Sequence, residues 1–196
     1  MLKAVLIGDS IRRNYQPLVA GKLEGRIRVT GPWENCRHSL WALDHYTQWV
    51  GLEMAEIVHV NFGIHDSALM RDNRPQVVLE QYKLCVARFF ECARDPLTTV
   101  IWATTTPVLL PEKGVPMNRW KKRPLIDEYN AAALEIARNA GVPVNDLHQV
   151  VLDNDYTRCI CDDGTHLTPH GNEVLAAAVA NAILNAAHSR PGCRDC

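Results

Sequence analysis

The chain has 196 residues, with 21 Lys and Arg against 22 Asp and Glu, and 47% of its residues are hydrophobic. This length fits one domain with a substantial core, and the net charge of -1 argues against a dedicated nucleic-acid-binding protein, which usually presents a basic face. The sequence has neither a run of about 18 apolar residues, as a membrane span needs, nor the separate cleavage region of a secretory signal. We therefore expect a globular, cytoplasmic protein without nucleic-acid or membrane partners.

Short apolar runs alternate along the chain with amphipathic stretches of helical spacing. The runs predict strands, in chain order, at 2–7, 26–30, 55–62, 98–104 and 142–145. The stretches predict helices at 12–24, 39–53, 75–93, 125–140 and 168–188. Residues 107–124 contain four prolines and a basic cluster, which is typical of a long surface loop.

Strands that alternate with helices indicate βαβ units and a parallel sheet covered on both faces. We therefore predict an α/β three-layer sandwich with about five parallel strands. The sequence shows no internal boundary, so residues 1–188 are predicted to form a single domain, followed by a C-terminal tail at 189–196.

Seven cysteines are spread through the chain, and reduced thiols are the expected state in a chain without an export signal. The pairs Cys159 with Cys161 and Cys193 with Cys196 could in principle form a zinc site or a disulfide. Their spacing is loose, and structural zinc usually needs two well-placed pairs. We therefore predict no metal site.

Polar residues follow the first predicted strand, where sites lie in parallel sheets. Gly8-Asp9-Ser10 follows that strand and opens a helix. A serine there would expose its hydroxyl, and its amide, at the positive end of the helix, could stabilise an oxyanion. The alternative is that Asp9 or Ser10 simply caps the helix, as these residue types often do.

A carboxylate and an imidazole stand close together near the other end of the chain. Asp163 lies three residues before His166, ahead of the Ala-rich last helix. A carboxylate one tight turn away can hydrogen-bond the imidazole and fix the tautomer and orientation of that base. The alternative is an Asp-Gly turn with an exposed His.

In their order and spacing, Gly8-Asp9-Ser10, Gly63-Ile64-His65-Asp66 and Asp163-x-x-His166 resemble the SGNH (GDSL) hydrolase superfamily over nearly the whole chain. This resemblance implies a flavodoxin-like sandwich in which Ser10 is the nucleophile, His166 the base and Asp163 the orienting carboxylate. It also implies ester hydrolysis through an acyl-serine intermediate, with no metal or cofactor.

The third family motif departs from its usual form. It normally reads Gly-x-Asn-Asp, with the Asn donating to the oxyanion, and here His65 stands at that position. Either the amide of Asn61 or a neutral His65 N–H could donate instead. The structural alternatives are that Asn61 satisfies backbone groups at a strand end and that His65 binds Asp66.

The second family motif also differs, because no glycine stands at the expected place after Gly31-Pro32. We expect residues 35–37 to occupy this loop and the Arg37 amide to replace the glycine amide, since a backbone donor requires glycine only where the dihedral does. The Arg37 guanidinium would also suit an anionic or sugar substrate. A plain surface arginine is the alternative.

The substrate is predicted from the loops, most of which are short and favour a short acyl group. Trp33, Trp41 and Trp120 could stack on a sugar, although Trp41 has the helical spacing of a core residue. We therefore predict an esterase that removes acetyl groups from a small-molecule or carbohydrate ester. A thioesterase, lysophospholipase or acyltransferase with the same residues, and a non-catalytic flavodoxin-like binding module, are the alternatives.

Overall fold

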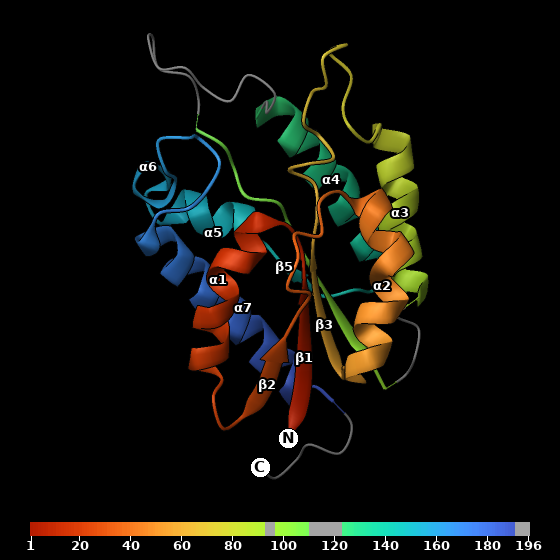
Figure 1. Ribbon diagram of the computed structural model, residues 1–196, viewed down its shortest axis with the longest axis vertical. Helices are drawn as coiled ribbons and strands as arrows, with labels where there is room; N and C mark the ends of the chain where they lie inside the picture. Colours follow the sequence, from red (N-terminus) through yellow and green to blue (C-terminus); the bar gives the residue numbers. More distant parts are fainter. Residues whose placement is uncertain (93–96, 110–122, 191–196) are drawn as a thin grey trace.

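The computed structural model describes residues 1–92, 97–109 and 123–190. A five-stranded sheet of order β2-β1-β3-β4-β5 runs through its middle (Figure 1). The strands are β1 (Leu2–Ile7), β2 (Ile27–Thr30), β3 (Ile57–Asn61), β4 (Thr99–Ala103) and β5 (Val144–Asn145). The described pairings are all parallel, as the alternation of strands and helices predicted.

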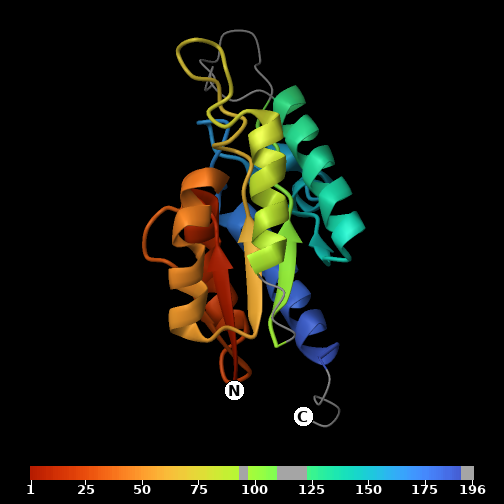
Figure 2. The same ribbon diagram turned by 90° about the vertical axis from the view of Figure 1, so that its right-hand side faces the viewer.

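Helices cover both faces of this sheet, which confirms the predicted three-layer sandwich (Figures 1 and 2). The described helices are α1 (Ser10–Lys22), α2 (Ser39–Glu53), α3 (Leu79–Cys92), α4 (Arg123–Ala140), α5 (Leu147–Asp153), α6 (Tyr156–Cys159) and α7 (Pro169–His188). Helices α1 and α7 pack together on one face, and α2, α3 and α4 form a row on the other. None of the helices within the described ranges combines the length and apolar character that a membrane span requires.

Several predicted boundaries differ from the observed ones. Helix α1 starts at Ser10 rather than at residue 12, because Asp9 caps it. Pro75 does not open α3 but forms an isolated bridge with Leu69. Helix α4 starts at Arg123, where Pro124 suits the first turn. Most of the predicted 107–124 loop, with Trp120, lies outside the described residues.

The strands bury successive side chains in two separate cores. In β1, Ala4 and Leu6 belong to the core beneath α1 and α7, whereas Val5 and Ile7 belong to the core beneath α2, α3 and α4. A strand covered on both faces needs an uninterrupted apolar run, because its side chains alternate between the faces. This is why residues 4–7 of β1 are uninterrupted apolar residues, whereas the edge strand β2 exposes Arg28.

The order of the strands determines where a site can form. The chain moves from β1 outward to β2, then returns to β3 on the other side of β1. At such a switch point the loops after neighbouring strands diverge and leave a crevice at the carboxyl ends. Because Ile7 of β1 lies in register with Val60 of β3, the segments that follow them begin at the same level of the sheet.

Candidate active site

Ser10 is the first residue of α1 and follows β1 after a two-residue connection. Asp9 is the N-cap of this helix, and its Oδ1 accepts the Ile11 amide at 2.8 Å. The helix itself offers the Ser10 amide no acceptor, because the first amides of a helix lack a preceding carbonyl. The Asp9 side chain therefore has the capping role that the sequence left open, and the Ser10 amide stands at the positive end of the helix dipole.

Ser10, His166 and Asp163 form a continuous chain of hydrogen bonds. The Ser10 Oγ lies 2.9 Å from His166 Nε2 across 156 positions of sequence. On the other side of the ring, His166 Nδ1 lies 2.5 Å from Asp163 Oδ2. An ionised carboxylate can only accept, so this contact places the ring proton on Nδ1. The Nε2 lone pair then faces the serine hydroxyl.

The turn between Asp163 and His166 holds the carboxylate in place. Its Oδ1 accepts the amides of Thr165 and His166, each at 2.9 Å. Burial raises the pKa of Asp163, but the bonds from the His166 ring and from these two amides outweigh that effect, so the pKa lies below its ordinary value. The carboxyl is therefore ionised at neutral pH and keeps its acceptor role.

The loop that precedes α2 reaches the start of α1. The Cys36 amide donates to the Gly8 carbonyl at 3.2 Å. Arg37 has φ 54°, in the left-handed region that favours glycine, and its amide donates to Asn35 Oδ1 at 2.8 Å. The exposed Arg37 guanidinium lies over the Trp41 ring, 4.9 Å from the centroid. The 35–37 segment thus lies beside the start of α1, and the Arg37 amide, which we expected to replace the glycine amide, is instead bonded to Asn35.

Asn61 ends β3 and is bound to the neighbouring strand. Its Nδ2 donates to the carbonyls of Ala103 at 3.0 Å and Thr104 at 2.8 Å. Both amide hydrogens are therefore directed at backbone oxygens, and the side chain joins the end of β3 to the end of β4. This is the strand-end role that the sequence had offered as the structural alternative.

His65 lies in the turn after β3 and is half-buried. The turn starts at Gly63, whose φ of +142° and close approach to Thr105 leave little room for a side chain. Asp66 is fully buried, and its Oδ1 accepts both the amide (2.9 Å) and the hydroxyl (2.5 Å) of Ser39. The start of α2 is thereby attached to the turn that carries His65.

Sequence reasoning missed Arg12 and the Ser39 contact with Asp66. Arg12 is 1% exposed and belongs to the buried stripe of α1 together with Tyr15 and Val19. The signal was present, because Arg12 precedes these residues at helical spacing. This spacing did not by itself predict that Arg12 is buried, because arginine is mostly exposed unless it is paired.

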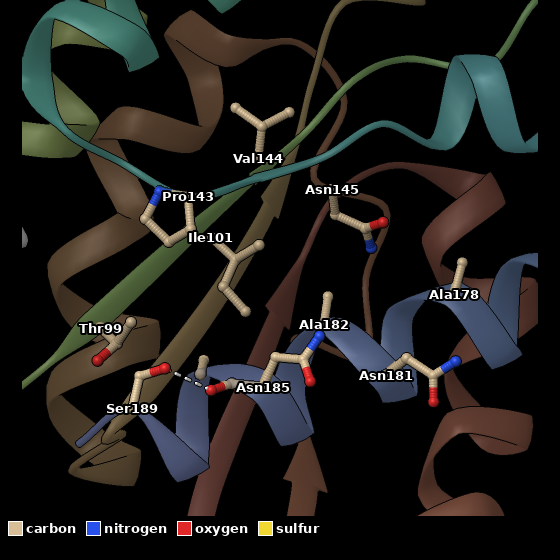
Figure 3. A pocket seen from close by; sticks show the side chains of 11 residues that line it. Thr99, Ile101, Pro143, Val144, Asn145, Ala178, Asn181, Ala182, Asn185 and Ser189 are labelled. Atoms are coloured by element: carbon tan, nitrogen blue, oxygen red, sulfur yellow. Dashed lines mark hydrogen bonds between the residues drawn. The ribbon is translucent and has the colours of Figure 1, made fainter.

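A groove of about 520 Å³ lies between the sheet and α7 (Figure 3). It is lined by the start of β4, by β5 and by the second half of α7, including Asn145, Asn181 and Asn185. His166 precedes the N-terminus of α7, a helix of 20 residues and thus about 30 Å long. The groove therefore lies along the second half of α7, whereas His166 precedes the first turn of that helix.

The cysteine and metal predictions concern another part of the chain. Cys159 and Cys161 carry free thiols, whereas Cys193 and Cys196 lie outside the described residues. Within the described ranges, His, Cys, Asp and Glu side chains do not gather into a group of three that could hold a metal ion.

The all-parallel sheet and its two helical layers match the α/β fold of the SGNH hydrolases, with Ser10 at the carboxyl edge of the sheet. Residues 6–174 match the model of the GDSL-like lipase/acylhydrolase family. The chain belongs to this family.

Curated relatives carry the description isoamyl acetate-hydrolyzing esterase 1 homolog. The human protein is 30% identical over an alignment of 135 positions, which covers 63% of this chain and 54% of that protein. The rat protein is 29% identical over 195 residues, covering 88% of this chain and 78% of its own. The chain thus spans about half of the human relative and a larger share of the rat one.

Solved structures share the fold. A lipase/acylhydrolase from Enterococcus faecalis has a TM-score of 0.78 at 20% identity, covering 94% of this chain and 96% of its own. An acetylxylan esterase from Geobacillus stearothermophilus has a TM-score of 0.74 at 20% identity, covering 93% of this chain and 94% of its own.

Proposed function

We propose that this protein hydrolyses short-chain carboxylic esters, acetyl esters above all, through an acyl intermediate on Ser10. The observation that carries the proposal is the unbroken row of hydrogen bonds from Ser10 Oγ through the His166 ring to Asp163. This row supplies a nucleophile, a base within reach of its proton, and a carboxylate that orients the base.

The proposed reaction has two halves. His166 Nε2 takes the Ser10 proton as Oγ attacks the ester carbonyl, and the imidazolium then gives that proton to the departing alcohol. Water enters, loses a proton to Nε2 and attacks the acyl-serine, which releases the acid and returns the proton to Ser10. Asp163 remains ionised throughout, as its lowered pKa requires.

The oxyanion formed in each half needs donors. We propose the Ser10 amide, the Asn35 amide and an N–H of His65, because the Cys36 and Arg37 amides are bonded to the Gly8 carbonyl and to Asn35 Oδ1. The Ser10 amide is supported by its position at the start of α1. His65 is supported because the Asn61 amide already donates to the carbonyls of Ala103 and Thr104. Replacing His65 by Ala is expected to lower kcat by about 10²–10³, the usual cost of one oxyanion donor. An unchanged kcat would exclude His65.

The acetyl preference rests on the relatives. The curated relatives are described as isoamyl acetate-hydrolyzing, and a protein of the same fold is an acetylxylan esterase. A carbohydrate substrate is supported by Trp33, which is 85% exposed in the loop beside the serine, since such a ring offers a flat apolar surface. We further propose a cytoplasmic location, in keeping with the free thiols of Cys36 and Cys85. Cell fractionation tests that location.

The test is hydrolysis of p-nitrophenyl acetate by the wild type and by Ser10→Ala, both checked for folding. We expect loss of activity in the variant, and rates that fall along an acetyl, butyryl, octanoyl series. Activity that survives in Ser10→Ala would exclude Ser10 as the nucleophile, and a marked preference for octanoyl would exclude the acetyl substrate. Capture of the acetyl group by added alcohols in preference to water would identify an acyltransferase.

Inactivity of the wild type on all these esters calls for a reagent that does not depend on the substrate. A fluorophosphonate reacts with an activated serine whatever ester the site accepts. Labelling of the wild type but not of Ser10→Ala would support a more selective hydrolase. Failure to label the wild type would favour the binding module.

A further inference from the structure

Arg12 is buried beside the proposed catalytic serine, two residues after it on α1, and all its described contacts are to uncharged groups. Its Nε and Nη2 donate to the Gly8 carbonyl at 3.3 and 3.1 Å. Its Nη1 donates to the Pro32 carbonyl at 2.8 Å, and Nη2 to the Glu34 carbonyl at 2.7 Å. The Gln16 Oε1 and the Cys36 Sγ complete the shell at 2.9 and 3.4 Å.

The ion pairs within the described residues do not include Arg12. A buried guanidinium without a carboxylate is costly, and only several well-directed hydrogen bonds compensate for the lost water. Three backbone carbonyls from two separate segments supply most of them here. The segments must therefore keep the positions in which their carbonyls meet the guanidinium.

One of these segments is the 31–37 loop, which contains a proposed oxyanion donor. In a planar trans peptide the carbonyl and the following N–H point in opposite directions. With the Pro32 and Glu34 carbonyls turned toward Arg12, the amides of Trp33 and Asn35 point away from it. Arg12 thus sets the peptide planes of the loop. The bond from the Cys36 amide to the Gly8 carbonyl joins the same loop to the residue before Asp9.

We propose that Arg12 is a positioning residue for ester hydrolysis, which fixes the 31–37 loop against the start of α1 so that the oxyanion donors are set before substrate binds. The inference rests on the proposed function of Ser10. It predicts that Arg12 affects the transition state more than the ground state, because the oxyanion exists only after attack.

The main test compares Arg12→Lys with Arg13→Lys, its exposed neighbour on the same helix. Lysine keeps the buried charge but concentrates its donors on one atom, so it cannot span the same carbonyls. We expect kcat for p-nitrophenyl acetate to fall about 10²-fold in Arg12→Lys, with KM within about threefold. The Arg13→Lys control is expected to keep both constants.

A second variant, Arg12→Ala, separates positioning from general stability. Guanidinium chloride at tens of millimolar is expected to restore kcat at least about tenfold, and ammonium chloride at equal ionic strength is not, because only the planar cation matches the carbonyls. A folded Arg12→Lys with wild-type kcat would overturn the proposal. The proposal would also be overturned if the activity of Arg12→Ala simply followed its folded fraction and guanidinium did not restore it. Failure of both variants to fold would overturn it as well.

Ser10→Ala distinguishes this failure from failure of the proposed function. If Ser10→Ala is inactive and both Arg12 variants keep their kcat, only the positioning role is wrong. If Ser10→Ala remains active, the proposed function is wrong and the Arg12 proposal falls with it.

Discussion

Arg37 combines two features with opposite effects on stability. Its φ of 54° is strained for a residue with a Cβ, by about 1–2 kcal/mol. Its guanidinium lies over the Trp41 ring, a contact that stabilises by about 0.5–1 kcal/mol at an exposed site. Replacing Arg37 by glycine relieves the backbone strain and loses the cation–π contact. Replacing it by alanine loses the same contact but keeps the strain.

The strain can be measured by comparing Arg37→Gly with Arg37→Ala. Both lose the cation–π contact, so the difference between them isolates the backbone. We expect the glycine variant to be more stable than the alanine variant by about 1 kcal/mol, or about 2–4 °C in Tm for a chain of this size. Thermal unfolding followed by circular dichroism measures this, and equal Tm values would refute the strain.

The site residues differ in how far the sequence could assign them. Ser10, Asp163 and His166 follow short motifs, and the structure brings them into hydrogen-bond contact, while their catalytic roles remain proposals. The partners of Asn61 and Arg12 are backbone carbonyls of distant segments. Side-chain identity at those segments carries no trace of such a contact, so the sequence could not show it.

At the scale of elements, α7 packs so closely against α6 that residue 171 has no room for a side chain. A Cβ on Gly171 would lie 2.2 Å from the Cys159 carbonyl oxygen. The Thr168 hydroxyl, which caps α7 by accepting the Gly171 amide, also donates to the Arg158 carbonyl at 2.7 Å. This contact fixes Thr168, the N-cap of α7 two residues after His166, against the preceding helix.

Gly171→Ala is therefore expected to be destabilising, by about 1–3 kcal/mol, because a backbone atom must move. Gly21→Ala is the matched control, since Gly21 lies in α1 with open space around it. Alanine there should stabilise the helix by up to about 1 kcal/mol. Urea unfolding of both variants measures the difference, and shifts in the same direction would contradict it.

Elements were predicted unequally well. The strands were found because a sheet covered on both faces imposes continuous apolar runs. The helices α5 and α6 were missed, since 7 and 4 residues are too few to show a helical period. The observed starts of α1, α3 and α4 differ from the predicted starts by two to four residues, because capping and proline chemistry, not apolar spacing, determine them. The single domain over 1–188 and the tail at 189–196 remain predictions.

For the molecule as a whole, buried Asp66 links stability to pH. Burial raises its pKa to about 6, and the bonds from Ser39 only partly oppose this. Unfolding returns the pKa to about 3.9. As pH falls from 6 toward 4, the folded state takes up a proton that the unfolded state does not, so this residue adds stability on acidification and costs stability above pH 6.

Asp66→Asn removes this titration while leaving an oxygen to accept from Ser39. The stability of the wild type relative to the variant should increase from pH 7 to pH 4, by about 2 kcal/mol. Buried His59, whose pKa burial lowers to about 4, has the opposite dependence but is common to both proteins. Urea midpoints at pH 7.5, 5 and 4 test this, and parallel curves would argue against it.

The 156 positions between Ser10 and His166 have a consequence for biosynthesis. A ribosome adding about 5–20 residues per second needs roughly 8–30 s to pass from the first of these residues to the second. During that time β1, α1 and the serine exist without the imidazole of His166. The proposed hydrolytic site is therefore incomplete in the nascent chain until His166 has left the exit tunnel, and on this proposal the chain does not hydrolyse esters near the translating ribosome before then.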